Sequence, residues 1–423
     1  MEKSSRKFIV LWFGQLLASI GHGMTAFALG VVAFKLSNKA MDSSLVMLFG
    51  FLPNVLLTVP AGVLADKYDR RLLMILADGL SIIGLVIILL GKIRGSLSLA
   101  LILIGVGISA VFSSLMQPAF EATISDLLDK DKYTKASGLV QIANSAKFLI
   151  SPLLAAFVLE NYGLELVLIL DISTVIVTVL ATTYVRKGLK TKEVQNMVDF
   201  NKDLKEAWQV LRNNTGIFVL VLIASLLTFF VGFIQNLSSP YFLSFSNSQA
   251  LARSMSISAL GMLASGIILG TVSIEKNFIA KLSLGLFAAG ACMLGYGATE
   301  NFYIITLFGF MFFACLPVIN ACLDYLVRTN IENKYQGRVF SFIGLISQMG
   351  FIAAYIISGF LTDKIFTPAL LDGGILANSI GEIIGTGPAK GIAFEIMLAG
   401  IFLSIVSMVL ANNSQVRELE NPK

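Results

Sequence analysis

The stretch VLVLIASLLTFFVGFI at residues 219–234 contains no charged side chain and is long enough to form most of a membrane-spanning helix. A second apolar run, LVIILLG at 85–91, is also unbroken by charge. Within a bilayer only helices and closed β-barrels satisfy all backbone hydrogen bonds. Barrel strands would show short segments of alternating apolar and polar residues. These runs therefore indicate membrane helices.

The composition of the whole chain agrees with these runs. Of 423 residues, 56% are apolar and 13% are charged, and the mean hydropathy is +0.83. A water-soluble chain of this length would divide into several cores and need a charged surface to cover them. Disorder would need low hydrophobicity and high net charge. Both classes are excluded, so we expect a membrane protein and not an enzyme.

The apolar runs predict twelve spans, six in each half of the chain, and hence an all-α fold of two six-helix bundles. The spans lie at about 8–34, 44–65, 72–91, 97–120, 137–160, 162–185, 216–240, 251–273, 278–298, 301–327, 338–361 and 390–411.

The longest polar interruption separates the two halves. We expect an N-terminal bundle at 1–185, a cytoplasmic linker at 186–215 and a C-terminal bundle at 216–423. Within the linker, Phe200–Leu211 has apolar residues on one side, which is typical of a surface helix. A disordered linker is the alternative.

The two halves of the chain also share a short sequence pattern. Pro118 precedes a Lys132-Tyr133 pair in the first half, and Pro317 precedes a Lys334-Tyr335 pair in the second. Repeated six-helix halves with a binding site between them define a known transporter architecture.

Lysine and arginine near the span ends set the orientation. With both termini in the cytoplasm, the inside segments hold 23 of the 31 basic residues. We therefore expect a multi-pass protein of the cell membrane with both termini inside. The basic pI then reflects topology and contact with anionic lipid headgroups, and no nucleic-acid partner is implied.

Signals for cofactors are missing from the sequence. Cys315 and Cys322 are seven residues apart on one predicted helix and cannot form a disulfide, and no Cys/His metal cluster is present. No nucleotide-binding motif of the form G-x-x-x-x-G-K-[ST] occurs. We expect no cofactor, no metal and a monomeric protein.

The strongest local motif is GVLADKYDRR at 62–71, between the second and third spans. Gly62 would let two helices approach closely, and Asp66 would meet a helix N-terminus or an arginine. Arg70 and Arg71 offer partners to carboxylates at neighbouring helix ends. The motif predicts a cytoplasmic gate, whereas a plain positive-inside turn would need no Gly or Asp at these places.

This motif resembles the loop signature of the major facilitator superfamily, with Lys67 in place of Arg and Asp69 in place of Gly. Within that superfamily the chain is similar to the twelve-helix drug exporters that include the macrolide efflux proteins. The stretches that carry this similarity are WFGQLLASIG at 12–21, LILDIS at 168–173, NIENKYQGRVFS at 330–341 and LLDGGILANSIGEIIGTGPAKGIAF at 370–394. The resemblance implies proton-driven export, although Ser109 stands where such exporters commonly have an Arg in the fourth helix.

Ionisable residues inside spans are costly, so each is a candidate for substrate binding or proton coupling. His22 follows Gln15 on one face of the first helix and could carry a proton or bind a substrate. The alternative is a structural hydrogen bond from His22 to the backbone carbonyl of a neighbouring helix. Lys147 and Asp171 lie at similar heights in the fifth and sixth helices, so they are candidates for a buried pair, structural or proton-coupling. The neutral candidates of the second half are Gln235, Asn236 and Asn320.

Further candidates for the cytoplasmic gate lie at helix ends. Glu121 or Asp126 could meet the arginines of the motif, and Asp324 and Arg328 are spaced for a salt bridge on one helix face. Arg338, in the loop before the eleventh helix, completes this set.

With 31 Phe and 14 Met, the spans can offer adaptable apolar walls to a lipophilic substrate. The sequence therefore predicts an alternating-access exporter of lipophilic or amphiphilic compounds, macrolide-like drugs by resemblance, coupled to protons. Export of an endogenous siderophore, lipid or metabolite is the first alternative. A membrane sensor or scramblase without coupled transport is the second.

Overall fold

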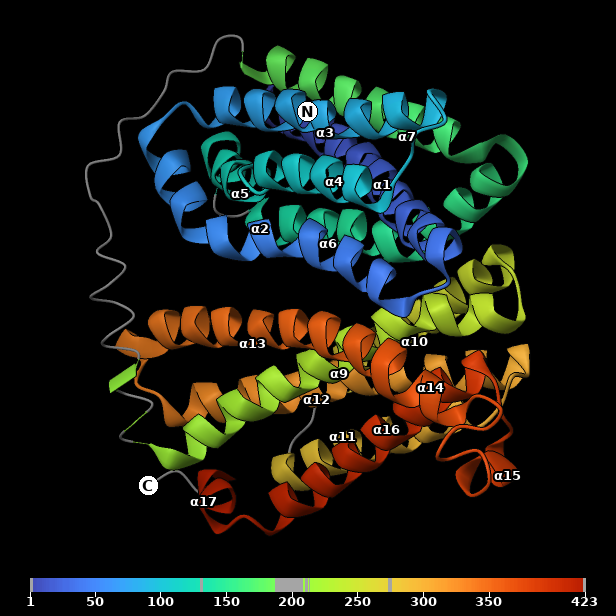
Figure 1. Cartoon of the computed structure of the whole chain (residues 1–423). Coiled ribbons are helices and arrows are strands. Elements are labelled where there is room, and N and C mark those ends of the chain that lie inside the picture. Colours follow the sequence, from blue (N-terminus) through green and yellow to red (C-terminus); the bar gives the residue numbers. More distant parts are fainter. Residues whose placement is uncertain are drawn as a thin grey trace. The chain divides into compact units, whose positions relative to one another are not determined.

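The computed structural model describes residues 3–129, 132–186, 208, 209, 212, 214–272 and 276–420 (Figure 1). Most of these residues are helical and none of them lies in a strand, so the predicted all-α membrane fold is confirmed. Most of the predicted linker, and all of the proposed surface helix at 200–211 except residues 208 and 209, lies outside the described residues.

The chain divides into two compact units. Unit 1 comprises Met1–Ser37 and Leu45–Val198, and unit 2 comprises Asn38–Ser44 and Asp199–Lys423. The boundary therefore falls inside the second helix, whose first residues belong to unit 2.

The helices of the first half begin and end as follows: α1 Lys3–Ser37, α2 Ala40–Lys67, α3 Arg70–Ile93, α4 Leu99–Ser113, α5 Met116–Leu127, α6 Tyr133–Leu149 and α7 Ser151–Arg186. Those of the second half are α9 Thr215–Phe245, α10 Ser248–Thr271, α11 Phe278–Gly297, α12 Phe302–Asn330, α13 Asn333–Leu361, the π-helix η2 Thr362–Phe366, α14 Thr367–Leu370, α15 Ile380–Ile384, α16 Pro388–Asn412, α17 Ser414–Arg417 and η3 Glu418–Glu420.

Eleven helical segments in the described part of the chain are long and apolar enough to cross a membrane. One of them, Lys135–Arg186, has 52 residues and contains Gly163 with φ +83°. At 1.5 Å per residue this segment is about 78 Å long, more than twice the roughly 30 Å of a bilayer core. Gly163 takes a left-handed conformation that other residues rarely adopt, so the chain reverses there. The segment holds two crossings, which brings the total to twelve.

Polar side chains start several of these helices. Ser98 Oγ accepts from Leu101 N at 3.3 Å, Asn214 Oδ1 from Ile217 N at 3.2 Å and Asn247 Oδ1 from Ala250 N at 2.9 Å. Each bond satisfies a backbone donor that the helix itself leaves free. The helix boundaries are therefore set by local chemistry, while the apolar runs set the helix lengths.

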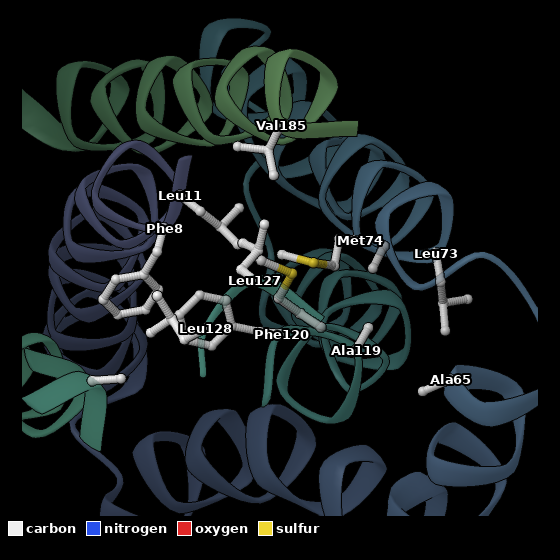
Figure 2. Packing of buried hydrophobic residues seen from close by; sticks show 13 residues of the cluster. Phe8, Leu11, Ala65, Leu73, Met74, Ala119, Phe120, Leu127, Leu128 and Val185 are labelled. Carbon is white, nitrogen blue, oxygen red and sulfur yellow. The ribbon is translucent and has the colours of Figure 1, made fainter. Parts of the chain in front are cut away.

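In unit 1, six helices contribute to one hydrophobic cluster near the α2–α3 loop (Figure 2), namely α1, α2, α3, α5, α6 and α7. Phe8 and Leu11 come from α1, Met74 from α3, Phe120 from α5 and Val185 from α7, and all five are buried. The cluster therefore packs these helices together at one end of unit 1.

Small residues bring α3 and α4 together, as is common between membrane helices. A Cβ on Gly84 would lie 2.1 Å from the Gly105 carbonyl oxygen and 2.8 Å from the Ser109 backbone nitrogen. Ser109 is therefore part of this tight contact.

We expect Gly84→Ala to destabilise the protein by about 1–3 kcal/mol, because backbone atoms of α4 must move to admit the methyl group. Gly79→Ala is the matched control in the same helix, since a Cβ there would meet no heavy atom within 4 Å. Thermal unfolding in detergent measures both. Equal midpoints for the two variants would contradict the close packing of α3 on α4.

Candidate functional site: charged side chains inside unit 1

The centre of unit 1 contains a hydrogen-bonded pair of ionisable side chains. His22 Nδ1 of α1 lies 2.8 Å from Asp171 Oδ1 of α7, and the two side chains are 30% and 2% exposed. Two hydrogen bonds hold α1 beside α7. Thr178 Oγ1 donates to Gly14 O at 2.9 Å, and Ser151 Oγ donates to Ile20 O at 3.0 Å. The partner of His22 is thus a carboxylate and not a backbone carbonyl.

Asp78 of α3 is a second buried carboxyl, 3% exposed, and its Oδ2 has no hydrogen-bond partner among the described residues. Its charge interacts with those of His22 and Asp171. The sequence did carry a signal for it, because Asp78 is a carboxylate within a predicted span. Our sequence prediction missed it.

Lys147 of α6 is an exposed side chain at the edge of this group. Its Cγ lies 3.0 Å from where a Cβ of Gly23 in α1 would stand, and its charge interacts with those of His22 and Asp171. Asp171 is hydrogen-bonded to His22. The expected ion pair between Lys147 and Asp171 does not occur among the described contacts.

We refer to His22, Asp78, Lys147 and Asp171 as the unit 1 charge cluster. With both carboxylates and the lysine charged and His22 neutral, the formal charge of the cluster is −1. One added proton on His22 brings it to zero. Since an uncompensated charge inside a membrane protein is costly, this composition favours the uptake of a single proton or a cationic group.

The other predicted binding residues have different surroundings. Gln15 lies in α1, and its Oε1 is buried with no hydrogen-bond partner in the part of the chain that the structure describes. Gln235 is half-buried in α9, and Asn320 is exposed on α12. Asn236 is buried and donates to Ser44 Oγ at 2.6 Å and Ser358 Oγ at 2.8 Å. These bonds give Asn236 a structural role in unit 2.

The α2–α3 motif forms a compact ion cluster in unit 1. Arg70 Nη1 lies 2.9 Å from Asp126 Oδ1, and Arg71 Nη2 lies 3.1 Å from Asp126 Oδ2. Arg70 also donates to the carbonyl oxygens of Ala65 at 3.2 Å and Ala122 at 3.1 Å. Arg71 is only 3% exposed. Of the two carboxylates considered from the sequence, Asp126 is the one that meets the arginines.

The remaining gate candidates lie elsewhere. Glu121 is exposed and accepts from Gln117, and a Cβ on Gly62 would meet no heavy atom within 4 Å, so the expected close helix approach is not seen there. The Arg328 guanidinium lies 4.6 Å from the centre of the Phe340 ring, and Asp324 is exposed. Asp66 and Arg338 belong to α2 and α13, and their side chains are outside the described part of the structure.

Asp69 of the α2–α3 motif has three contacts of its own. Its carboxylate accepts from Arg71 N at 3.0 Å and Leu72 N at 3.4 Å, which starts α3, and Oδ2 lies 2.8 Å from Arg186 Nε. Burial alone would raise the pKa of this carboxyl, but the hydrogen bonds from Arg186, Leu72 and Arg71 lower its pKa from the usual 3.8. The deprotonated form is therefore the one that the fold stabilises.

The pKa of Asp69 is lower in the folded protein than in the unfolded chain. Ionised Asp69 therefore contributes its full stabilisation of the fold above pH about 4, and this contribution is lost as the pH falls through the folded-state pKa. Asp69→Asn should remove this acid dependence and cost less than about 1 kcal/mol at neutral pH, because Arg186 is 43% exposed. Asp69→Ala also removes the helix cap, for a further loss of about 0.5–2 kcal/mol. Thermal unfolding between pH 3 and 7 compares the variants. An Asn variant as unstable as the Ala variant would contradict the capping role.

The described residues contain no group of three or more His, Cys, Asp or Glu side chains that could hold a metal ion. Cys292, Cys315 and Cys322 are free thiols.

The long apolar helices are typical of a multi-pass membrane protein. The sequence profile of the Major Facilitator Superfamily matches residues 11–355. This chain therefore belongs to the major facilitator superfamily.

Known proteins similar to this chain include macrolide efflux proteins. Macrolide efflux protein A of Streptococcus pyogenes is 26% identical over 373 residues, which are 86% of this chain and 92% of that protein. The protein of the same name from Enterococcus faecalis is 26% identical over 317 residues, which are 73% of this chain and 98% of that protein. The crystal structure of a bacterial homologue of the human lysosomal transporter Spinster is 13% identical, with a TM-score of 0.72 over 97% of each chain, a similarity that shows the fold.

Proposed function

We propose that this transporter exports lipophilic or amphiphilic compounds in exchange for protons, with macrolide-like drugs as the first substrates to test. The observation that carries the proposal is the hydrogen-bonded His22–Asp171 pair, 2.8 Å apart within a cluster of net charge −1. Such a cluster can gain and lose a single proton at low electrostatic cost. Similarity to the macrolide efflux proteins supports the substrate class.

The proposal assigns roles to the rest of the chain. With both termini in the cytoplasm, as the basic residues predict, the Arg70–Arg71–Asp126 ion cluster lies at the cytoplasmic end of unit 1 and stabilises one arrangement of its helices. Protonation of His22 changes the charge between α1, α3 and α7, the helices that carry the pair and Asp78. Alternating access then links this change to substrate release. The protein acts as a monomer, with protons, lipid and a lipophilic substrate as its partners.

Accumulation assays in cells test the activity. Cells that express the protein should hold less of a macrolide than cells with an empty vector, and an uncoupler should abolish the difference. A panel that includes siderophores and lipid probes tests the alternative endogenous substrates. Unchanged accumulation of every compound would contradict export, and export that survives the uncoupler would contradict proton coupling.

A further inference from the structure

Unit 2 contains a buried carboxyl that the sequence prediction also missed. Glu395 of α16 is 1% exposed and is the one buried acidic side chain of this unit in the described ranges. Its Oε2 accepts a hydrogen bond from Thr362 Oγ1, whereas its Oε1 has no partner among the described side chains and backbone. A carboxylate left in this state would carry a buried and half-satisfied charge, which is strongly unfavourable. A bound proton on Oε1 removes that charge.

Thr362 begins the π-helix η2, which continues α13. Single π-turns are rare and often mark functional positions. Here α16 packs directly on the turn: a Cβ on Gly391 would lie 2.6 Å from Thr367 Cα and 2.8 Å from the Phe366 carbonyl carbon. Glu395 itself contacts the first residue of the turn, because its carboxyl accepts the hydrogen bond from Thr362.

The next residue of the turn, Asp363, holds the beginning of α2. Its Oδ1 accepts from Ala40 N at 3.0 Å and its Oδ2 accepts from Met41 N at 2.9 Å. All three residues belong to unit 2, and from Leu45 onward the same helix belongs to unit 1. A carboxylate at a helix N-terminus is favoured both by the free N–H groups and by the helix dipole. The charge of Asp363 therefore fixes the first turn of a helix that continues into the other unit.

Asp363 is also the charged neighbour of Glu395. Their electrostatic interaction is repulsive when both are ionised. The other charged side chains of the packed elements are few. The first turn of α2 contains Asp42, and Lys39 directly precedes this helix. Helices α9 and α14 contain no charged residue, η2 adds Lys364, and Lys390 of α16 pairs with Glu300 at 2.7 Å. Lys281 of α11, Lys334 and Arg338 of α13 and Arg417 of α17 lie at sequence positions near the other ends of the spans.

We propose that Glu395 is a proton-binding site in unit 2, and that it retains its proton while Asp363 caps α2. Loss of the proton to solvent water places a second negative charge beside Asp363 and weakens the Asp363 bonds to Ala40 and Met41. The site is separate from the His22–Asp171 pair and needs no substrate. It can therefore be tested, and can fail, independently of the proposed export.

Hydrogen–deuterium exchange of the purified full-length protein, without substrate, tests the proposal. The readout is the peptide that contains Ala40 and Met41, with exchange times scaled at each pH to keep the intrinsic exchange rate constant. We expect the protection of this peptide to fall at least about tenfold as the pH rises through the titration of Glu395. Glu395→Gln should keep the peptide protected at every pH, and Asp363→Asn should leave it weakly protected at every pH.

Glu382→Gln is the matched control, because Glu382 is an exposed carboxyl of α15 in the same unit, and it should behave like the wild type. Infrared difference spectra should contain a carboxyl C=O band that appears on acidification and is absent from Glu395→Gln. If this variant does not fold, Thr362→Val serves instead and should move the midpoint of the transition. A pH-dependent change that persists in Glu395→Gln, an unmoved midpoint in Thr362→Val, or full protection in Asp363→Asn would overturn the proposal.

Discussion

Asp171→Asn is expected to lower proton-driven export at least about tenfold, equivalent to about 1.4 kcal/mol or more. Asn retains the shape of the side chain and one hydrogen bond to His22, which lies 2.8 Å away. It removes the charge, however, so the unit 1 charge cluster is already neutral when His22 is neutral. Protonation of His22 would then place an uncompensated positive charge inside the span, which is costly.

The controls separate loss of the proton site from loss of the fold. Glu165→Gln changes another carboxyl of α7 that is 38% exposed, with Lys92 at 3.9 Å, and should transport normally. His22→Gln should lose coupled export, and the double variant with Asp171→Asn should be no worse than either single variant because the pair acts as a unit. Independent, additive losses would show that the two residues do not share a role. Equal purified yields are required for the comparison.

Asp126→Asn is expected to destabilise unit 1 by about 3–5 kcal/mol. Asp126 is the carboxylate shared by Arg70 and Arg71, at 2.9 and 3.1 Å. Without the charge of Asp126, Arg71 remains 3% exposed with no opposing carboxylate in the described contacts. The unfolding midpoint in detergent should fall by roughly 6–12 °C or more for a unit of this size.

Glu121→Gln provides the matched control on the same helix, since Glu121 is exposed and contacts Gln117. Its midpoint should stay within about 1 °C of the wild type, as for most surface changes. Should Asp126→Asn melt at the same temperature as Glu121→Gln, the ion cluster would contribute nothing to the stability of unit 1.

The fold was accessible from sequence because lipid imposes a length and a composition on every span. Apolar runs predicted all the crossings, including the two within Lys135–Arg186, where Gly163 interrupts the helix. The helix break between α4 and α5 was not predicted. It lies at Ser114 and Leu115, within a predicted span that extended from 97 to 120.

Pairing of charges was harder to predict than their presence. Lys147 and Asp171 were matched by height along adjacent helices, but rotation about each helix axis decides which side chains meet, and α1 supplies His22 instead. Rotation about the helix axis also explains why Asp126 meets the arginines and Glu121 does not. Five residues turn a helix by about 500°, so the two carboxylates point about 140° apart and only one can face the arginines.

Asp78 and Glu395 could have been found from the sequence, since both are carboxylates inside predicted spans. The contact of Asp363 with Ala40 and Met41 could not, because it joins residues more than 320 positions apart through a π-turn. Such contacts depend on how helices approach each other, which no local pattern records.

Flux in proteoliposomes tests the central claim, proton-coupled export, most directly. Purified wild type, Asp171→Asn and Glu165→Gln are reconstituted, and the movement of a radiolabelled macrolide is followed under an imposed pH gradient. We predict movement against the concentration gradient for the wild type and Glu165→Gln, and downhill movement at most for Asp171→Asn. No uphill movement by the wild type under any gradient, or equal uphill movement by Asp171→Asn, would contradict proton-coupled export through the His22–Asp171 pair.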